Sequence, residues 1–256
     1  MSGEPLVLIK NDPRGRVLAL VQALSRLPEH PRWVLIGGVA VNVRLARLHR
    51  ATNDVDALTA NQAELVETLL AGNADPLSAA KIQCHDPEVE VDVMESTEGQ
   101  DLPSGSQDRA FALVRRWTMQ TATQMTIGVV DGAGAVFTST TPAVASRAAL
   151  IALKALSIPR RRRGSYPEKI GSDIQDLYRL VDGQNLGALA GDFASLEDEA
   201  RKWVGSALVN SFSEAGDVRY AGLRLRRYAL NVDAQTITDA DLTIVAELGS
   251  ALVNNE

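Results

Sequence analysis

The sequence predicts an α+β protein, in which a mixed sheet with helices (residues 1–140) precedes an all-helical domain (residues 141–256). Two observations predict this division. Up to residue 138, short runs rich in Val, Ile and Leu alternate with longer amphipathic stretches, whereas after residue 141 apolar residues recur at helical spacing. Hydrophobic residues make up 45% of the chain and charged residues 23%, which is the composition of a globular protein with a sizeable core.

The elements of the first domain follow from turn residues and periodicity. Asp12 and Pro13 predict the N-cap and first position of a helix, which apolar spacing continues to Leu27. Gly37 and Gly38 stand where a predicted strand gives way to a helix. The predicted strands cover residues 33–36, 54–58, 81–84 and 89–94, and a hairpin joins residues 125–130 to 135–138. The predicted helices after the first cover residues 39–48, 62–70 and 110–119.

The second domain is predicted to contain helices alone, at residues 142–157, 169–181, 196–212, 218–230 and 239–252.

Composition excludes several classes of protein. A single cysteine, Cys84, rules out an internal disulfide framework and a multi-cysteine zinc site. The chain begins without a basic segment and an apolar signal stretch, and no apolar run could span a bilayer, so we expect a cytoplasmic protein without a membrane partner. The net charge is −6, yet residues 101–190 carry 11 basic and 7 acidic side chains, which indicates a local anion site.

The glycine pair and two aspartates suggest chemistry. Gly37 and Gly38 at the start of a helix would let phosphate oxygens approach backbone N–H groups closely. Asp54 and Asp56 alternate with Val55, so on a strand their carboxylates leave on the same face. Paired carboxylates suit Mg²⁺, which prefers oxygen ligands and keeps positions for substrate phosphates.

A third acid would complete such a site. Residues 89–93 alternate valine with Glu90 and Asp92, and we choose Asp92 because valines flank it on both sides. Glu90 is the alternative. Plain structural interpretations also exist. For Asp54 and Asp56 the alternative is solvation at a strand end, and for Glu90 and Asp92 it is a solvated strand face. Lys154, within an apolar helix, either extends to solvent or meets a carboxylate or a phosphate.

Taken in order, these motifs resemble the nucleotidyltransferase superfamily related to DNA polymerase beta. The similarity is greatest to its AbiEii branch, the toxins of type IV toxin–antitoxin systems that include the mycobacterial MenT proteins. The motifs are Gly-Gly-x-Ala at residues 37–40, Arg-x-Thr-x-Asp-x-Asp at residues 50–56, and Lys154 followed by Asp-Leu-Tyr from Asp176. The resemblance covers roughly residues 33–180. Val39 departs from it, because a hydroxyl residue often stands there.

The resemblance implies a nucleotidyltransferase fold and transfer of a nucleoside monophosphate from an NTP with Mg²⁺ or Mn²⁺. An RNA acceptor, in particular a tRNA 3′ end, and a cognate antitoxin are the implied partners. The implied metal ligands are Asp54, Asp56 and Asp92. The implied nucleotide-binding residues are Gly37, Gly38, Arg50, Thr52 and Lys154. The implied catalytic residues are Asp54, Asp56, Lys154 and Asp176.

Other functions compete with this one. In one alternative, the acceptor is a small molecule of the aminoglycoside type or a protein side chain. In another, the protein is a nucleotide-binding module whose catalytic site has decayed and which has no enzymatic activity. The four arginines of residues 160–163 are either a solvated loop or a contact to RNA phosphates.

Overall fold

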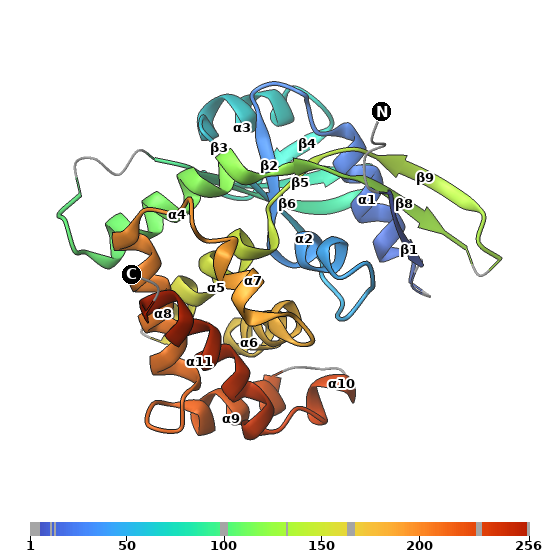
Figure 1. Cartoon of the computed structure of the whole chain (residues 1–256). Coiled ribbons are helices and arrows are strands. Elements are labelled where there is room, and N and C mark those ends of the chain that lie inside the picture. The colour runs from blue at the N-terminus through green and yellow to red at the C-terminus, as the bar shows by residue number, and fades with distance from the viewer. Residues whose placement is uncertain are drawn as a thin grey trace. The chain divides into compact units, whose positions relative to one another are not determined.

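The computed structural model describes residues 6–10, 12, 14–97, 102–131, 133–162, 167–228 and 232–254, and the chain divides into two compact units (Figure 1). The first unit comprises Met1–Thr97 and Thr118–Ser146, and the second comprises Glu98–Trp117 and Arg147–Glu256. The chain passes from the second unit to the first within helix α4 (Gln107–Thr121). The domain boundary expected after residue 140 stays a prediction.

The first unit contains two mixed sheets. The larger has the strand order β4-β5-β6-β3-β2-β10-β7, in which β3/β6 and β2/β10 are parallel pairs and the other pairs are antiparallel. Its strands are β2 (Trp33–Ile36), β3 (Asp54–Thr59), β4 (Ala74–Pro76), β5 (Lys81–His85), β6 (Glu88–Glu95), β7 (Thr123–Gln124) and β10 (Ala143–Val144). The smaller has the order β1-β8-β9, formed by β1 (Leu6–Lys10), β8 (Thr126–Val130) and β9 (Val136–Thr140). Strands β8 and β9 form the predicted hairpin.

Residue patterning explains why β2, β3 and β6 form the centre of the larger sheet. All four residues of β2 are buried. In β6, buried valines at positions 89, 91 and 93 alternate with more exposed polar residues, and β3 begins with the same alternation. A strand with this period of two puts its valines into the core and its acids on the opposite face.

The first helix differs from the prediction. Helix α1 (Arg16–Arg26) begins four residues after Asp12, because Gly15 adopts a left-handed conformation with φ 69° and redirects the chain. The Asp12 carboxylate still accepts the backbone N–H of Val17, at 2.8 Å, and of Arg14, at 2.9 Å. Asp12 therefore caps α1 from a position outside the helix. Pro13 lies outside the described residues.

The helix expected to start at Pro142 also begins later. Helix α5 (Arg147–Arg162) follows strand β10, which pairs with β2 on one side and β7 on the other. Arg44 holds this segment extended, because its Nε donates to the Ala145 carbonyl and its Nη2 to the Val144 carbonyl, both at 2.7 Å. Sheet pairing thus overrides helical spacing here.

The other helices of the first unit are α2 (Gly37–Arg44) and α3 (Gln62–Leu70). Helix α3 matches its prediction, whereas α2 ends four residues early because Ala46 takes a positive φ of 51°. The elements that were not predicted are β1, β4, β7, β10, α7 (Leu186–Gly191) and α10 (Val232–Gln235).

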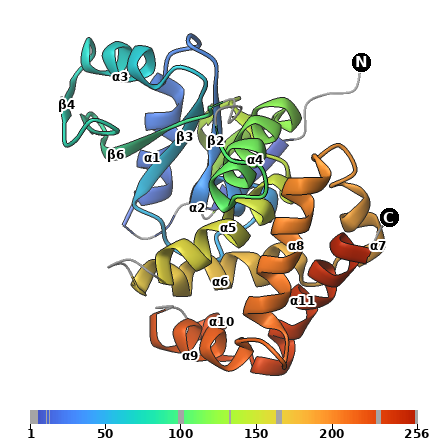
Figure 2. The same cartoon turned by 90° about the vertical axis from the view of Figure 1, so that its left-hand side faces the viewer.

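The described part of the second unit contains helices and no strand. These helices are α5, α6 (Pro167–Val181), α7, α8 (Asp198–Phe212), α9 (Val218–Tyr228), α10 and α11 (Asp239–Asn254). The first part of α4 also belongs to this unit. Helices α8 and α11 lie side by side (Figure 2), and a Cβ at Gly249 would stand 2.7 Å from the Gly205 carbonyl oxygen. The predicted fold class, α+β followed by helices, is confirmed. None of the described helices has both the length and the apolar character needed to cross a membrane.

Candidate active site

Four acidic residues form two cross-strand pairs on one face of the larger sheet. Strands β3 and β6 are parallel neighbours whose register pairs Asp54 with Glu90 and Asp56 with Asp92. Neighbouring strands lie about 4.8 Å apart, so the side chains of each pair leave the sheet next to one another. Val55 lies between the two pairs and is fully buried on the opposite face. The structure thus brings together the three acids that the sequence singled out.

The glycine pair lies against one of these acids. Strand β2 runs antiparallel to β3 and pairs Ile36 with Asp56, so α2 begins beside that carboxylate. Gly37 has φ 68°, and a Cβ there would stand 1.8 Å from Asp56 Oδ2. The close approach and the left-handed backbone both require glycine at this position.

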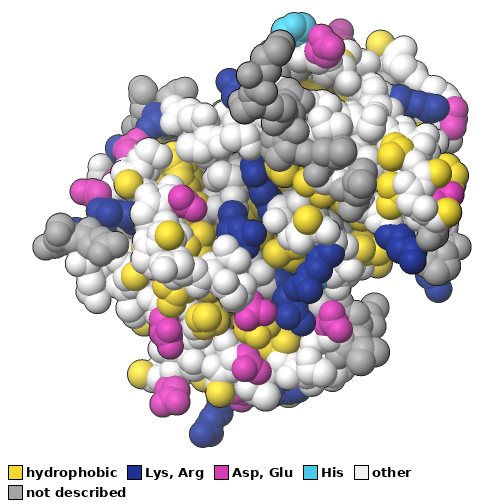
Figure 3. Space-filling view, turned by 45° about the vertical axis from the view of Figure 1, so that its right-hand side comes forward, with side chains coloured by type: hydrophobic (Ala, Val, Ile, Leu, Met, Phe, Trp, Pro, Cys, Tyr) yellow, Lys and Arg dark blue, Asp and Glu magenta, His cyan; other side chains and the backbone are white. Residues whose placement is uncertain are grey.

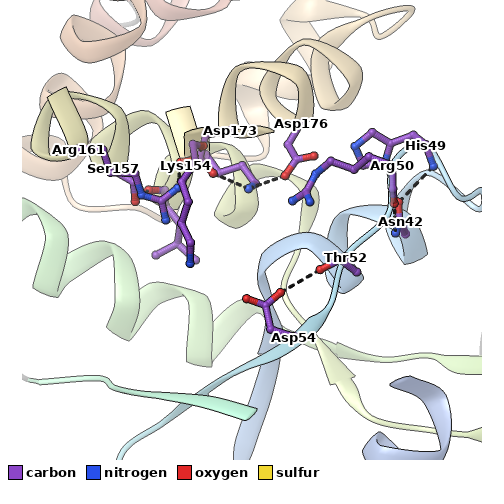
Figure 4. A network of polar contacts seen from close by, with 12 residues as sticks. Asn42, His49, Arg50, Thr52, Asp54, Lys154, Ser157, Arg161, Asp173 and Asp176 are labelled. Atoms are coloured by element: carbon purple, nitrogen blue, oxygen red, sulfur yellow. Dashed lines mark hydrogen bonds and ion pairs between the residues drawn. The ribbon is translucent and has the colours of Figure 1, made fainter. Parts of the chain in front are cut away.

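Arg50 and Thr52 lie beside Gly38, the second glycine of the pair. A Cβ at Gly38 would stand 2.7 Å from Arg50 Nη2 and 3.0 Å from Thr52 Oγ1. Thr52 Oγ1 in turn donates a hydrogen bond of 3.0 Å to Asp54 Oδ1 (Figure 4). The residues predicted to bind nucleotide in this unit, Gly37, Gly38, Arg50 and Thr52, therefore gather around the start of α2, next to the acids.

A buried asparagine that sequence reasoning missed positions this loop. Asn42, on α2, donates from Nδ2 to the Arg50 carbonyl at 3.3 Å, while its Oδ1 accepts the His49 N–H at 3.2 Å and lies 2.6 Å from His49 Nδ1. Asn42 and His49 are both buried. The signal in the sequence was an asparagine within an otherwise apolar helix, which must meet polar partners once it is buried.

Lys81 is the second residue that the sequence analysis missed. It lies on β5, which pairs with β6 and brings Lys81 opposite Asp92. Its Nζ contacts Glu90 Oε1 and lies 3.7 Å from Asp92 Oδ2. The hydrogen bond to Glu90 raises the pKa of Lys81, with partial burial opposing and the charges of Asp92, Glu90 and Asp54 adding to the increase. The acids therefore share one face with a permanent cation.

The acids can hold a divalent cation only together with water or substrate oxygens as further ligands. No group of three or more His, Cys, Asp or Glu side chains within the described ranges is gathered closely enough to hold a metal ion by itself. Mg²⁺ and Mn²⁺ are hard ions that are often held by one or two carboxylates together with water and substrate phosphates. An all-oxygen set, with the Asp56 carboxylate against a glycine backbone, fits such an ion. That Asp54, Asp56 and Asp92 are its ligands stays a prediction.

Lys154 and Asp176 belong to the second unit. Lys154 Nζ, on α5, lies 3.0 Å from Asp173 Oδ1 and 2.6 Å from Asp176 Oδ2, both on α6, and Arg161 contacts Asp173 as well (Figure 4). Lys154, Asp173 and Asp176 are buried. The interpretation in which Lys154 extends to solvent is therefore wrong. Two carboxylates compensate its burial, and the second of them, Asp173, was not foreseen.

The described arginines of the run at residues 160–163 are all paired within the second unit. Arg160 contacts Asp108, Arg161 contacts Asp173, and Arg162 lies 2.6 Å from Asp217 and over the Tyr220 ring. Arg163 lies outside the described residues. Paired guanidinium groups have much of their charge offset, which favours a structural role for this run over a contact to RNA phosphates. On the face shown in Figure 3, Lys and Arg side chains occur together with Asp and Glu.

Comparison with known proteins identifies the family of the chain. Residues 18–243 match the family described as "Nucleotidyl transferase AbiEii toxin, Type IV TA system", which confirms the resemblance noted from the motifs. A crystal structure of an antigenic nucleotidyltransferase-like protein from Paracoccidioides brasiliensis is similar at 16% identity, covering 74% of this chain and 92% of its own, with a TM-score of 0.41. No protein with a curated description matches the sequence.

Proposed function

The chain belongs to the AbiEii family of nucleotidyltransferase toxins and is therefore a nucleotidyltransferase; on that premise we propose that it transfers a nucleoside monophosphate from an NTP to RNA, preferably a tRNA 3′ end, with Mg²⁺ or Mn²⁺. Membership of this type IV toxin–antitoxin family also implies an antitoxin partner. The cytoplasmic location is part of the same proposal.

The observation that carries the proposal is the position of the acids. Asp56 and Asp92 are neighbours in register, Asp54 lies on the same face, and the Asp56 carboxylate rests against Gly37. In the proposed reaction these carboxylates would hold the divalent cation, which would supply the positive charge that offsets the triphosphate. Asp54 is oriented for this task by Thr52, whose hydroxyl donates to it.

The start of α2 is proposed to bind the phosphates. Its N-cap residue, Ile36, offers no side-chain hydrogen bond, so the first N–H groups of the helix are not capped by a side chain from that position. Phosphate oxygens are suitable acceptors for such groups, because the N-terminus of a helix also carries a partial positive charge. Arg50, beside Gly38, adds a guanidinium group that matches phosphate geometry.

A groove next to the acids supports an acceptor that carries phosphate. The groove, of about 510 Å³, is lined by Thr52, by Arg14 and Arg16, and by Glu88 and Glu90. Arg14 and Arg16 are exposed and offer guanidinium groups to RNA phosphates, next to Glu88 and Glu90 of the same lining.

The proposal is tested by incubating the purified protein with labelled NTPs, Mg²⁺ and total tRNA, and by measuring label on RNA and release of pyrophosphate. We expect transfer by the wild type, and an Asp56→Asn variant without activity. Asp75→Asn is the matched control, because Asp75 is an exposed aspartate on β4 of the same sheet and should leave transfer unchanged.

Parallel reactions contain an aminoglycoside or a protein mixture in place of tRNA. Label on the aminoglycoside or on protein, with none on RNA, would reject RNA as the acceptor but would leave the nucleotidyltransferase activity established. Pyrophosphate release that is equal in the wild type and in Asp56→Asn would reject the proposed role of the acids. By the family motif, Lys154 is proposed to bind the nucleotide phosphates and Asp176 to position a reacting group. The variants Lys154→Arg and Asp176→Asn test these two roles in the same assay.

A further inference from the structure

Helix α9 is a basic helix on the surface of the second unit. Its sequence, Val218–Tyr228, contains four arginines and no acidic residue. Arg219, Leu223 and Arg227 recur at intervals of four residues, so they lie along one side of the helix, and all three are exposed. The buried residues form the opposite side and are Val218, Ala221, Gly222 and Leu225. The helix therefore turns its apolar side to the core of the unit and its arginines to solvent.

Two tyrosines lie among these arginines. Tyr220, Arg224 and Tyr228 form a second row at the same interval, beside the first. Arg224 Cζ lies 4.8 Å from the centre of the Tyr220 ring and 5.6 Å from that of Tyr228, and Arg224 Nη1 donates to the Tyr228 hydroxyl at 3.2 Å. Arg227 Cζ lies 5.4 Å from the centre of the Tyr228 ring. The rings hold these guanidinium groups at the surface, which lowers the entropy lost when they bind a ligand.

The charges of these arginines are not offset by carboxylates. Within the described ranges, no carboxylate forms an ion pair with Arg219, Arg224 or Arg227. A cation–π contact uses a ring and not an oxygen acceptor, so most of the five N–H donors of each guanidinium group are left for an oxygen ligand. Arg224 and Arg227 are also three residues apart, a spacing at which like charges destabilise a helix. An anionic ligand would relieve that repulsion.

The acids that flank the helix are already bound to other arginines. Asp217, which directly precedes α9, lies 2.6 Å from Arg162, and Asp239 lies 2.8 Å from Arg226. In these pairs the two charges offset one another, as they do for the described arginines of the run at residues 160–163. The exposed side of α9 therefore differs from an ordinary solvated helix face, on which both signs of charge are mixed.

Single-stranded RNA is the ligand that matches both side-chain types. Guanidinium groups bind phosphate oxygens in a planar fork, and unstacked bases stack on tyrosine rings and on guanidinium planes. A membrane surface fits less well, because an interfacial helix needs a broad apolar side for the lipid, and the apolar side of α9 is buried in the protein. Leu223, 57% exposed, is the large apolar residue that α9 presents to solvent.

We propose that the exposed side of α9 binds the single-stranded backbone of the RNA acceptor. The residues of this α9 face are Arg219, Tyr220, Leu223, Arg224, Arg227 and Tyr228. They are positioning residues and not catalytic ones, because they hold the acceptor and not its reacting atoms. The inference rests on the proposed function, since it takes RNA as the acceptor.

The test measures binding of a fluorescent single-stranded RNA with the sequence of a tRNA 3′ end, by anisotropy and without NTP. In Arg219→Gln/Arg227→Gln the dissociation constant should rise on the order of tenfold at about 0.1 M salt. The plot of log affinity against log salt concentration should become shallower by about 1.4, because each phosphate contact to a single strand contributes about 0.7. In the transfer assay the KM for RNA should rise while kcat changes little.

Two further variants test the reason for the loss. Arg219→Lys/Arg227→Lys keeps both charges and should keep the salt dependence of the wild type. Lys10→Gln/Lys202→Gln is the matched control, because it removes two exposed cations from β1 and α8 and changes the net charge equally. This control should bind RNA as the wild type does, and circular dichroism checks that each variant is folded. An equal loss of affinity in the control would show that net charge alone matters, which would overturn the assignment to α9.

The remaining outcomes separate this inference from the proposed function. If the wild type labels RNA but Arg219→Gln/Arg227→Gln binds RNA as tightly as the wild type does, the α9 face is refuted and the transferase stands. If RNA binding depends on the two arginines but no label reaches RNA, the α9 face stands as an RNA-binding surface and RNA is rejected as the acceptor. Sedimentation with vesicles of phosphatidylcholine and phosphatidylserine is the third arm. Vesicle binding that depends on Arg219 and Arg227, with unchanged RNA affinity, would replace RNA by a membrane surface.

Discussion

Replacing Gly37 by alanine tests the geometry of the acidic face most directly. Gly37 has φ 68°, a region in which a residue with a Cβ is less stable by about 1–2 kcal/mol. The added Cβ would also stand 1.8 Å from Asp56 Oδ2, far inside the roughly 3.5 Å at which non-bonded heavy atoms come into contact. To relieve this clash, the carboxylate and the backbone must separate by more than about 1 Å, a displacement that costs on the order of 100-fold in rate at a reacting centre.

Gly183→Ala is the matched control. Gly183 has nearly the same backbone conformation, with φ 71°, but a Cβ there would meet no atom within 4 Å. Urea unfolding should show a loss of about 1–2 kcal/mol in Gly183→Ala and at least as large a loss in Gly37→Ala, whereas transfer activity and Mn²⁺ binding should fall in Gly37→Ala alone. Gly38→Ala should lose less activity, because its Cβ would meet the flexible end of Arg50. If Gly37→Ala keeps wild-type activity while its stability falls like that of Gly183→Ala, the proposed contact between the glycine and Asp56 is wrong.

Three further predictions concern stability. Gly249→Ala should lower the free energy of unfolding by about 1–3 kcal/mol, because its Cβ would press on the Gly205 carbonyl and force α8 and α11 apart; unchanged urea unfolding would contradict this packing. Lys154→Met should lower it by about 3–5 kcal/mol, because it leaves buried carboxylates without their cation, and adding Asp176→Asn should recover part of the loss. For Asp12, partial burial raises the pKa, but backbone hydrogen bonds outweigh it and hold the pKa below the ordinary 3.8. The carboxylate therefore stabilises the fold above pH 4 and loses this effect as the pH falls through its lowered pKa. Asp12→Ala should cost about 1 kcal/mol at pH 7 and less at pH 3, and a difference that does not depend on pH would refute the cap.

Local patterning predicted most elements of the fold. Strands β2, β3 and β6 and helix α3 agree closely with their predicted ranges, because each has a periodicity or a turn signal of its own. The errors occur where distant residues decide. Strand β10 is two residues long and exists because β2 and β7 pair with it while Arg44 binds its carbonyls, which no local pattern around Pro142 reveals.

The candidate site shows the same division. Alternation with valine identified Asp54, Asp56 and Asp92 as residues on polar strand faces, since side-chain direction along a strand depends on local geometry alone. The resemblance in motif order gave the family, which the match over residues 18–243 confirms. The roles of the individual residues stay predictions.

By itself the sequence determined which residues share the face of a strand and which family the chain resembles, because both depend on the order of residues along the chain. The tertiary structure decided that β3 and β6 are parallel neighbours in register, that Asp56 rests on Gly37, and that Lys81 engages Glu90. These contacts join segments far apart in the chain. Their register is set by packing of the whole sheet, which no local pattern in the sequence reveals.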